Sequence, residues 1–181
     1  MRVIPTSFDE VLLLEPDVYS DNRGYFMETW QAGRYFSLGL KETFLQDNIS
    51  FSRKDVLRGL HFQSPNSQGK LATCLMGKVF DVVVDIRRDS KTFGKHFGIC
   101  LSQTEKLQIY VPPGFAHGFI VLSDWALFSY KCTMLYSPAS EHCILWNDPD
   151  IAIPWPVKQP VISAKDSQGV SLKEWLQEGS R

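Results

Sequence analysis

Short apolar runs separated by turn residues dominate this chain and most constrain its fold. The runs are rich in β-branched and aromatic side chains and are bounded by Gly, Pro, Asn, Asp and Ser, a pattern typical of strands. Only residues 32–40 and 172–177 have the pattern of a short helix. Many short strands with almost no helix predict an antiparallel sandwich or barrel. The predicted strands lie at 11–14, 25–30, 44–51, 56–63, 71–76, 79–86, 97–101, 108–121 (two strands around a Pro-Pro-Gly corner), 125–136 and 151–155.

The runs at 71–76 and 79–86 are joined by Gly77 and Lys78, which predicts a β-hairpin with its turn at these two residues. A hairpin that follows a histidine-bearing strand is compatible with a cupin. We therefore expect an all-β, cupin-like antiparallel jelly-roll barrel with short peripheral helices. No linker, repeat or low-complexity tract interrupts the 181 residues, so a single domain spanning 1–181 is expected.

Charge and cysteine content limit the partners and the compartment. The formal net charge of -1 gives no electrostatic reason to expect nucleic acid or an anionic membrane as partner. No stretch approaches membrane-spanning length, and the first residues lack the apolar core of a signal peptide. The cysteines include no CxxC pair, so neither a zinc site nor a disulfide framework is signalled. A cytoplasmic protein is expected. The cysteines are Cys74, Cys100, Cys132 and Cys143.

Residues 56–63 (VLRGLHFQ) form an apolar run that contains one arginine and one histidine. Such a run predicts a buried strand, whose interior normally excludes charged Arg58 and titratable His61. In an ideal strand these side chains, three positions apart, point to opposite faces. Gly59 lies between them and can host a bulge that turns both toward one cavity. The alternative is a hydrogen-bonded core histidine beside an arginine that extends to water.

Several ionisable residues within predicted strands are candidates for a common site. A neutral histidine accepts a proton near neutral pH, a phenol returns one, and a lysine stabilises an oxyanion between these events. This set suits proton abstraction next to a carbonyl group, whereas no activated Ser or Cys nucleophile signals acyl transfer. The residues are Arg58, His61, Lys70, Asp81, His117 and Tyr130.

Two carboxylates lie on the valine face of the predicted strand 79–86. Asp81 and Asp85 are expected either to pair with cations or to face the site, and Asp85, near the strand end, is expected to be structural. His117 alternates with Phe115 and Phe119, so a core histidine competes with a second site histidine.

A metal is disfavoured by the residues that follow the first site histidine. Metal-binding cupins resemble one another in a His-x-His pair followed by a Glu, whereas His61 is followed by Phe62 and Gln63. We therefore expect no metal.

A series of motifs, in order along nearly the whole chain, resembles the dTDP-4-dehydrorhamnose 3,5-epimerase family. The resemblance implies a cofactor-free cupin jelly roll, usually a homodimer, that acts on dTDP-4-dehydro-6-deoxy-D-glucose in dTDP-L-rhamnose synthesis. The motifs are 21–28 (DNRGYFME), 46–48 (QDN), 56–63 (VLRGLHFQ), 69–71 (GKL), 79–85 (VFDVVVD), 113–119 (PGFAHGF), 130–133 (YKCT), 145–148 (LWND) and 163–166 (SAKD).

The resemblance also implies catalytic roles. His61 resembles the family's base and Asp166 its dyad partner, which would hold the imidazole in one tautomer. Tyr130 resembles the general acid on the opposite face of the sugar, and Lys70 resembles the cation that stabilises the enolate. The ketone at C4 acidifies both adjacent C–H bonds, so one base and one acid can invert C3 and C5 in turn.

Substrate-binding positions are implied in the same way. Arg58 resembles a diphosphate ligand, and Arg23 resembles a second one, contributed by the N-terminal segment of the partner subunit. Phe26 and Tyr136 resemble the rings that sandwich thymine. The further binding positions are Glu28, Gln46, Asn48, His117, Glu141 and Lys165.

The chain departs from the family pattern at a few positions. Met134 and Leu135 stand where the family more often has a polar residue and an aromatic, and Cys143 stands where a small residue is usual. Three other functions remain open: an epimerase that inverts only C3 or C5, a non-catalytic cupin that binds a nucleotide sugar, and a metal-dependent cupin oxygenase. The expected partners are a dTDP-sugar and a second copy of the chain.

Overall fold

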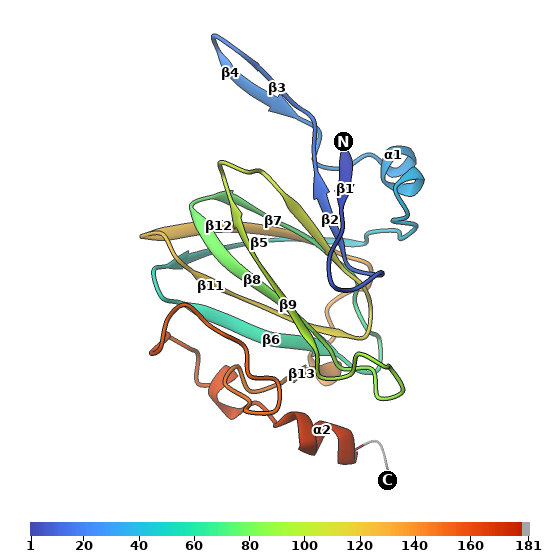
Figure 1. The fold of residues 1–181 in the computed structure, drawn as a ribbon, viewed down its shortest axis with the longest axis vertical. Helices are drawn as coiled ribbons and strands as arrows, with labels where there is room; N and C mark the ends of the chain where they lie inside the picture. The colour runs from blue at the N-terminus through green and yellow to red at the C-terminus, as the bar shows by residue number, and fades with distance from the viewer. Residues whose placement is uncertain (179–181) are drawn as a thin grey trace.

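The computed structural model describes residues 1–178 as two antiparallel sheets that face each other, with a separate hairpin (Figure 1). Residues 179–181, the end of the predicted domain, lie outside the described residues. In spatial order, one sheet contains β1 (Arg2–Ile4), β2 (Leu12–Glu15), β10 (Gln108–Val111), β7 (Lys70–Met76), β12 (Trp125–Cys132) and β5 (Gln46–Arg53). The other contains β13 (Glu141–Cys143), β6 (Leu57–Gln63), β11 (Phe115–Val121), β8 (Lys78–Asp85) and β9 (His96–Ser102). This arrangement confirms the predicted all-β jelly-roll class.

The facing surfaces of the two sheets supply a shared apolar core. Alternating side chains point inward from each strand, as the period of two requires. Fully burying one such side chain contributes about 1.5–3 kcal/mol, so the paired sheets form a rigid support for polar groups at their rim. The core includes Leu13, Ala72, Val79, Val83, Leu101, Ile109, Phe119 and Phe128.

Strand β6 contains the bulge predicted at Gly59. Its pairing with β11 shifts register between His117 and Phe119, and Gly59 has φ +133°. A Cβ at Gly59 would lie 2.6 Å from the Cα of Gly118, so only glycine fits there. Because of the bulge, Arg58 and His61 line the same cavity, which is one of the two alternatives that the sequence left open.

The hairpin predicted at Gly77 and Lys78 is wrong. Strand β7 pairs with β10 and β12, whereas β8 pairs with β11 and β9 in the other sheet. The chain therefore crosses between the sheets at Gly77, where φ is +81° and a Cβ would lie 2.2 Å from the main-chain oxygen of Trp125. The main-chain N–H of Lys78 is held by Ser123 in the β11–β12 connection, which crosses at the same place.

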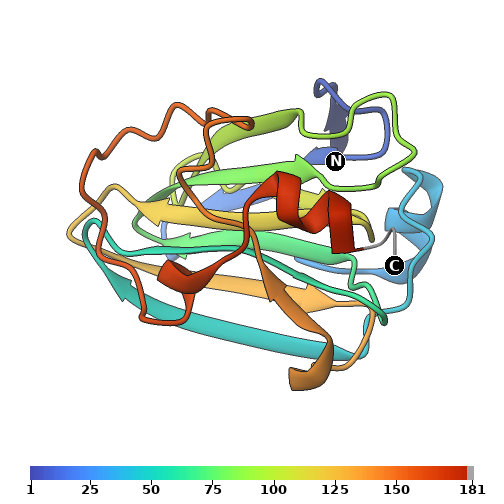
Figure 2. The same cartoon turned by 90° about the horizontal axis from the view of Figure 1, so that it is seen from below.

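The C-terminal segment covers the outer face of the five-stranded sheet (Figure 2). Helix α2 (Leu172–Glu178) begins with a capping box, in which Ser171 and Glu174 bond each other's main-chain N–H groups. The strand predicted at 151–155 is wrong, because this segment packs its apolar side chains on the sheet face and pairs with no edge. The same segment carries the short 3-10 helix η2 (Asp166–Gln168), which fixes Asp166 beside β6.

A hairpin projects from the N-terminal part of the chain, well away from both sheets (Figure 1). It consists of β3 (Val18–Asp21) and β4 (Gly24–Met27), and most of its side chains are exposed. Helix α1 (Ala32–Ser37) follows and packs through Tyr35, while a second 3-10 helix, η1 (Pro138–Ser140), precedes β13. No helix among residues 1–178 has the length and apolar character needed to cross a membrane.

Candidate active site

Two adjoining cavities open between the sheets, with volumes of about 290 and 260 Å³. Their common wall comes from the ends of β6, β7, β12 and β13 and from the loop after β12. They form one cleft, and most of the predicted site residues, from distant parts of the sequence, line it. The residues shared by both cavities are His61, Lys70, Tyr130, Tyr136 and Glu141.

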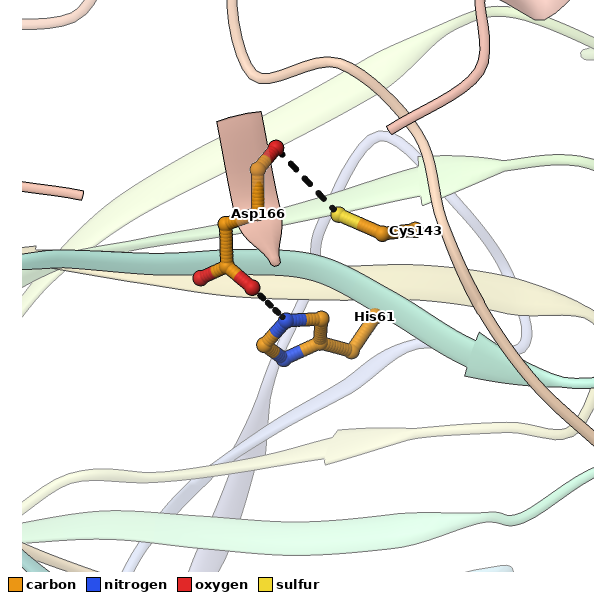
Figure 3. A group of neighbouring side chains, drawn as sticks. All are labelled: His61, Cys143 and Asp166. Atoms are coloured by element: carbon orange, nitrogen blue, oxygen red, sulfur yellow. Dashed lines mark hydrogen bonds and ion pairs between the residues drawn. The ribbon is translucent and has the colours of Figure 1, made fainter. Parts of the chain in front are cut away.

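His61 and Asp166 form a dyad at this cleft (Figure 3). His61 Nε2 lies 2.8 Å from Asp166 Oδ1, and the imidazole is partly exposed whereas the carboxylate is buried. Because an ionised carboxylate only accepts hydrogen bonds, Nε2 carries the proton and Nδ1 is left as the basic nitrogen. Burial alone would raise the pKa of Asp166. The hydrogen bond from His61, with help from the Gly59 N–H, outweighs burial and holds that pKa below its usual range.

Tyr130 and Lys70 complete the predicted catalytic set. Burial raises the pKa of Tyr130 above its ordinary value, although the nearby charge of Arg58 opposes the shift, so the phenol keeps its proton. Lys70 begins β7 and donates a long, 3.5 Å hydrogen bond to the main-chain oxygen of His61. Burial lowers the pKa of Lys70, and the neighbouring Cys132 opposes this. A protonated phenol and a desolvated amine therefore flank the dyad.

His117 and Arg58 line the inner cavity beside the dyad. His117 is the cross-strand partner of His61, and its Nε2 lies 2.9 and 3.0 Å from the two carboxylate oxygens of the fully buried Asp81. Asp81 is thus paired with a side chain that can carry a positive charge, which is one of the two alternatives expected from the sequence. The Nε of Arg58 donates to Ser52 Oγ at 2.9 Å, and its terminal nitrogens have no hydrogen-bond partner among residues 1–178.

The rim of the outer cavity is a hydrogen-bonded network of predicted binding residues. The predicted strand 125–136 ends at Cys132, and the chain then bends so that the main-chain N–H of Tyr136 donates to Gln46 Oε1 at 2.8 Å. The hydroxyl of Tyr136 and the ammonium of Lys165 both donate to Glu141 Oε2. Burial would raise the pKa of Glu141, but these bonds, that from Lys165 first, lower it overall. Asn48 accepts from Gln46 at 2.9 Å.

Arg23, Phe26 and Glu28 do not reach this cleft within one chain. Arg23 and Phe26 lie on the projecting hairpin, where Arg23 pairs with Asp21 and the Phe26 side chain is highly exposed. Glu28 pairs with Arg34 at 3.2 Å, and its Oε1 is buried without a partner among the described residues.

Sequence reasoning missed several polar residues that line the cleft. Gln63 and Gln68 lie on the outer cavity and bond the main chain of Leu135 and Met134. Ser50 lies on the inner cavity with its hydroxyl buried and unbonded among residues 1–178. Ser50 is two positions after Asn48 on β5, so alternation along the strand was the signal that could have found it.

One group of side chains has the composition of a metal-ligand set. His61, Cys143 and Asp166 offer an imidazole, a thiol and a carboxylate whose ligand atoms lie within 4.8 Å of one another. The expectation that the reaction needs no metal or cofactor stays a prediction. Asp85, by contrast, is structural as expected, since its buried carboxylate accepts from Arg87, Ser90 and Thr92.

A known protein family matches nearly the whole of this chain. Residues 5–174 match the family model described as dTDP-4-dehydrorhamnose 3,5-epimerase. The chain belongs to this family.

Relatives within the family are similar over nearly their full length. The dTDP-4-dehydrorhamnose 3,5-epimerase of Salmonella typhimurium is 52% identical over 179 residues, which cover 97% of this chain and 98% of that protein. The dTDP-4-dehydrorhamnose 3-epimerase of Streptomyces niveus is 36% identical, with 96% and 85% covered. The crystal structure of a dTDP-6-deoxy-D-glucose-3,5-epimerase from Legionella pneumophila, in complex with dTDP-4-keto-L-rhamnose, matches with a TM-score of 0.93 and 50% identity, covering 95% of this chain and 93% of that one.

Proposed function

We propose that this chain inverts C3 and C5 of dTDP-4-dehydro-6-deoxy-D-glucose to give dTDP-4-dehydro-L-rhamnose, without a redox cofactor. The observation that carries the proposal is that the His61–Asp166 dyad faces the same cleft as Lys70 and Tyr130. The similarity to the Salmonella 3,5-epimerase along nearly the whole chain supports the choice of substrate.

The reaction needs a base and an acid on opposite faces of the sugar ring. His61 Nδ1 takes the proton at C3 or C5, and the electrons move onto the C4 oxygen, where Lys70 stabilises the enolate. Tyr130 then returns a proton to the same carbon from the other face. Each inversion leaves an imidazolium and a phenolate, so both groups must exchange protons with solvent before the next inversion.

The nucleotide part would extend from the inner cavity, where Arg58 lies, to the outer cavity and its rim. The free terminal nitrogens of Arg58 suit the oxygens of a diphosphate, which a planar guanidinium binds through two parallel hydrogen bonds. Tyr136 presents a half-exposed ring for stacking on thymine, and the side chains of Gln46 and Asn48 supply amide groups nearby. Lys165, now bonded to Glu141, is a second cation within reach of the diphosphate.

The projecting hairpin supports a homodimer in which each subunit completes the other's site. Tyr19 and Phe26 are direct cross-strand partners, so their highly exposed rings share one face of the hairpin and offer an apolar surface that a partner could cover. Arg23, in the turn between β3 and β4, does not line the cleft of its own chain. Docking the hairpin on a second copy would bury the rings and deliver Arg23 and Phe26 to the partner's nucleotide.

An epimerase that inverts only C3 is the second candidate, because such a relative is 36% identical over almost the whole chain. The same dyad and acid serve either reaction, and the placement of the sugar decides which carbons react.

The test is incubation with dTDP-4-dehydro-6-deoxy-D-glucose in heavy water, with deuterium read at each carbon by NMR and a downstream 4-ketoreductase added in parallel. Deuterium at C3 and C5, with reduction to dTDP-L-rhamnose, is expected. Label at C3 alone would replace the proposal with the mono-epimerase, and an absence of label would leave only a nucleotide-sugar-binding protein.

A further inference from the structure

We propose that His61, Cys143 and Asp166 form a binding site for a thiophilic divalent cation such as Zn²⁺, and that an ion bound there switches off the catalytic base. The binding part of this inference stands on the arrangement of the three side chains. The inhibitory part rests on the proposed function.

The three ligands come from separate segments that the fold holds together. Cys143 on β13 is the direct cross-strand partner of His61 on β6, so their side chains project from neighbouring positions of the sheet. Asp166 on η2 lies across from both, with its carboxylate at His61 and its main-chain oxygen 4.0 Å from the Cys143 sulfur (Figure 3).

Only small movements would convert this group into a metal site. Zinc bonds of about 2.0–2.3 Å in tetrahedral geometry require ligand atoms roughly 3.3–3.6 Å apart. The 2.8 Å contact between Nε2 and Oδ1 must open by about half an ångström, and the sulfur, now within 4.8 Å of the other two atoms, must approach by about 1 Å. Rotation of the cysteine side chain about one bond supplies most of this approach.

The donor set selects the class of cation. Imidazole and thiolate suit borderline-soft ions such as Zn²⁺, whereas Mg²⁺ and Ca²⁺ prefer oxygen ligands. Burial raises the pKa of the Cys143 thiol to about 12, and the charge of Asp166 adds to the shift, so the thiol is protonated before the ion arrives. Binding releases one proton, from Cys143, and moves the single imidazole proton of His61 from Nε2 to Nδ1; a coordinated thiol stays deprotonated.

An ion at Nε2 removes the basic nitrogen from the cleft. A neutral imidazole bound through Nε2 carries its one proton on Nδ1, and Nδ1 is the atom that must accept a proton from the sugar. The ion thus takes the place of the dyad's proton and forces the wrong tautomer. The charge of Lys70, whose Nζ lies 3.5 Å from the main-chain oxygen of His61, opposes binding of the ion.

Binding is measured by titrating the metal-free protein with Co²⁺, which gives a near-ultraviolet charge-transfer band only when a thiolate is a ligand. The band is expected for the wild type and for Cys100→Ala, a control on β9 outside the cleft, and is lost in Cys143→Ala. The Zn²⁺ affinity of Cys143→Ala should fall by more than the roughly 10–100-fold that follows loss of a mere outer-shell partner. Cys143→Ser, which keeps the volume, is measured as well in case the Ala variant does not fold.

Inhibition is read in the heavy-water exchange assay. Zn²⁺ should stop exchange by the wild type, a chelator should restore it, and Cys143→Ala should exchange normally and resist the same Zn²⁺. Loss of the Co²⁺ band in Cys100→Ala, or its survival in Cys143→Ala, would overturn the site. A band without inhibition would overturn the switch alone. A protein that shows the band but never exchanges deuterium would refute the proposed function and leave the metal site standing.

Discussion

Replacing Asp166 tests the dyad most directly, because two substitutions at this position should differ in a way that only the tautomer explains. Asp166 Oδ2 accepts from the main-chain N–H of Gly59, while Oδ1 faces His61. In Asp166→Asn the amide oxygen must be the atom that accepts from the Gly59 N–H, because an amide NH₂ group in that position would place two donors against each other. The NH₂ group then points at Nε2 and forces the imidazole proton onto Nδ1.

The expected losses follow from this geometry. Asp166→Ala removes one hydrogen bond to a charged group, worth about 1.5–3 kcal/mol, so the exchange rate should fall by about 10–150-fold. Asp166→Asn also forces His61 into the tautomer whose Nδ1 is protonated. The equivalent substitution in catalytic triads lowers the rate by about 10⁴, so we expect the exchange rate to fall by roughly 10³–10⁴-fold. The more conservative substitution should therefore be the more damaging one.

The assay is the initial rate of deuterium incorporation at C3, with thermal unfolding as the control for folding. Both variants should unfold within a few degrees of the wild type. If Asp166→Asn were as active as Asp166→Ala, or more active, the carboxylate would not be setting the tautomer of His61, and the assignment of Nδ1 as the base would be wrong.

Three further predictions concern other parts of the molecule. Tyr130→Phe should still exchange deuterium at C3, but its rate of product formation should fall at least about 100-fold, which is the lower end of the contribution expected from a general acid. Equal losses in both assays would show that Tyr130 does not reprotonate the sugar. Arg23→Ala should raise the KM about 10–100-fold, as expected for a lost charged hydrogen bond, with the monomer fold unchanged by circular dichroism; an unchanged KM would refute the shared site. Arg87→Ala should lower the free energy of unfolding by about 2–4 kcal/mol at pH 7, measured by urea denaturation, because it strands the buried carboxylate of Asp85. Burial raises the pKa of Asp85 but its hydrogen bonds outweigh this and lower it, so its contribution is present above about pH 4 and is lost as the pH falls. The Arg87→Ala deficit should therefore shrink in acid, and a deficit that is constant from pH 7 to pH 3 would contradict the account.

The sequence predicted those features that local chemistry determines. Alternating apolar runs located most strands, and Gly59 between Arg58 and His61 marked the place where a bulge could bring both to one cavity. The Ser171–Glu174 spacing marks a helix start, and the helix expected at 172–177 is α2.

Features that depend on distant parts of the chain could not be predicted from local pattern. His61 and Asp166 are 105 positions apart, and nothing in the residues around Asp166 distinguishes it from a surface acid, so the family resemblance alone pointed to it. Gly77 and Lys78 have the chemistry of a tight turn, yet the chain crosses between sheets there, because the close approach of the β11–β12 connection decides the outcome.

The position of the hairpin also has a genetic consequence. If every cleft takes its own His61 and its neighbour's Arg23, two defective variants should complement each other when mixed: His61→Ala, which lacks the base, and Arg23→Ala, which has a raised KM. The mixture is assayed at a substrate concentration far below that raised KM. In a mixed dimer, one cleft has both defects and the other has none. Random pairing of equal amounts makes about half of the dimers mixed, so the mixture should recover about a quarter of the wild-type activity. Two alleles of this single gene would then give more activity together than either gives alone.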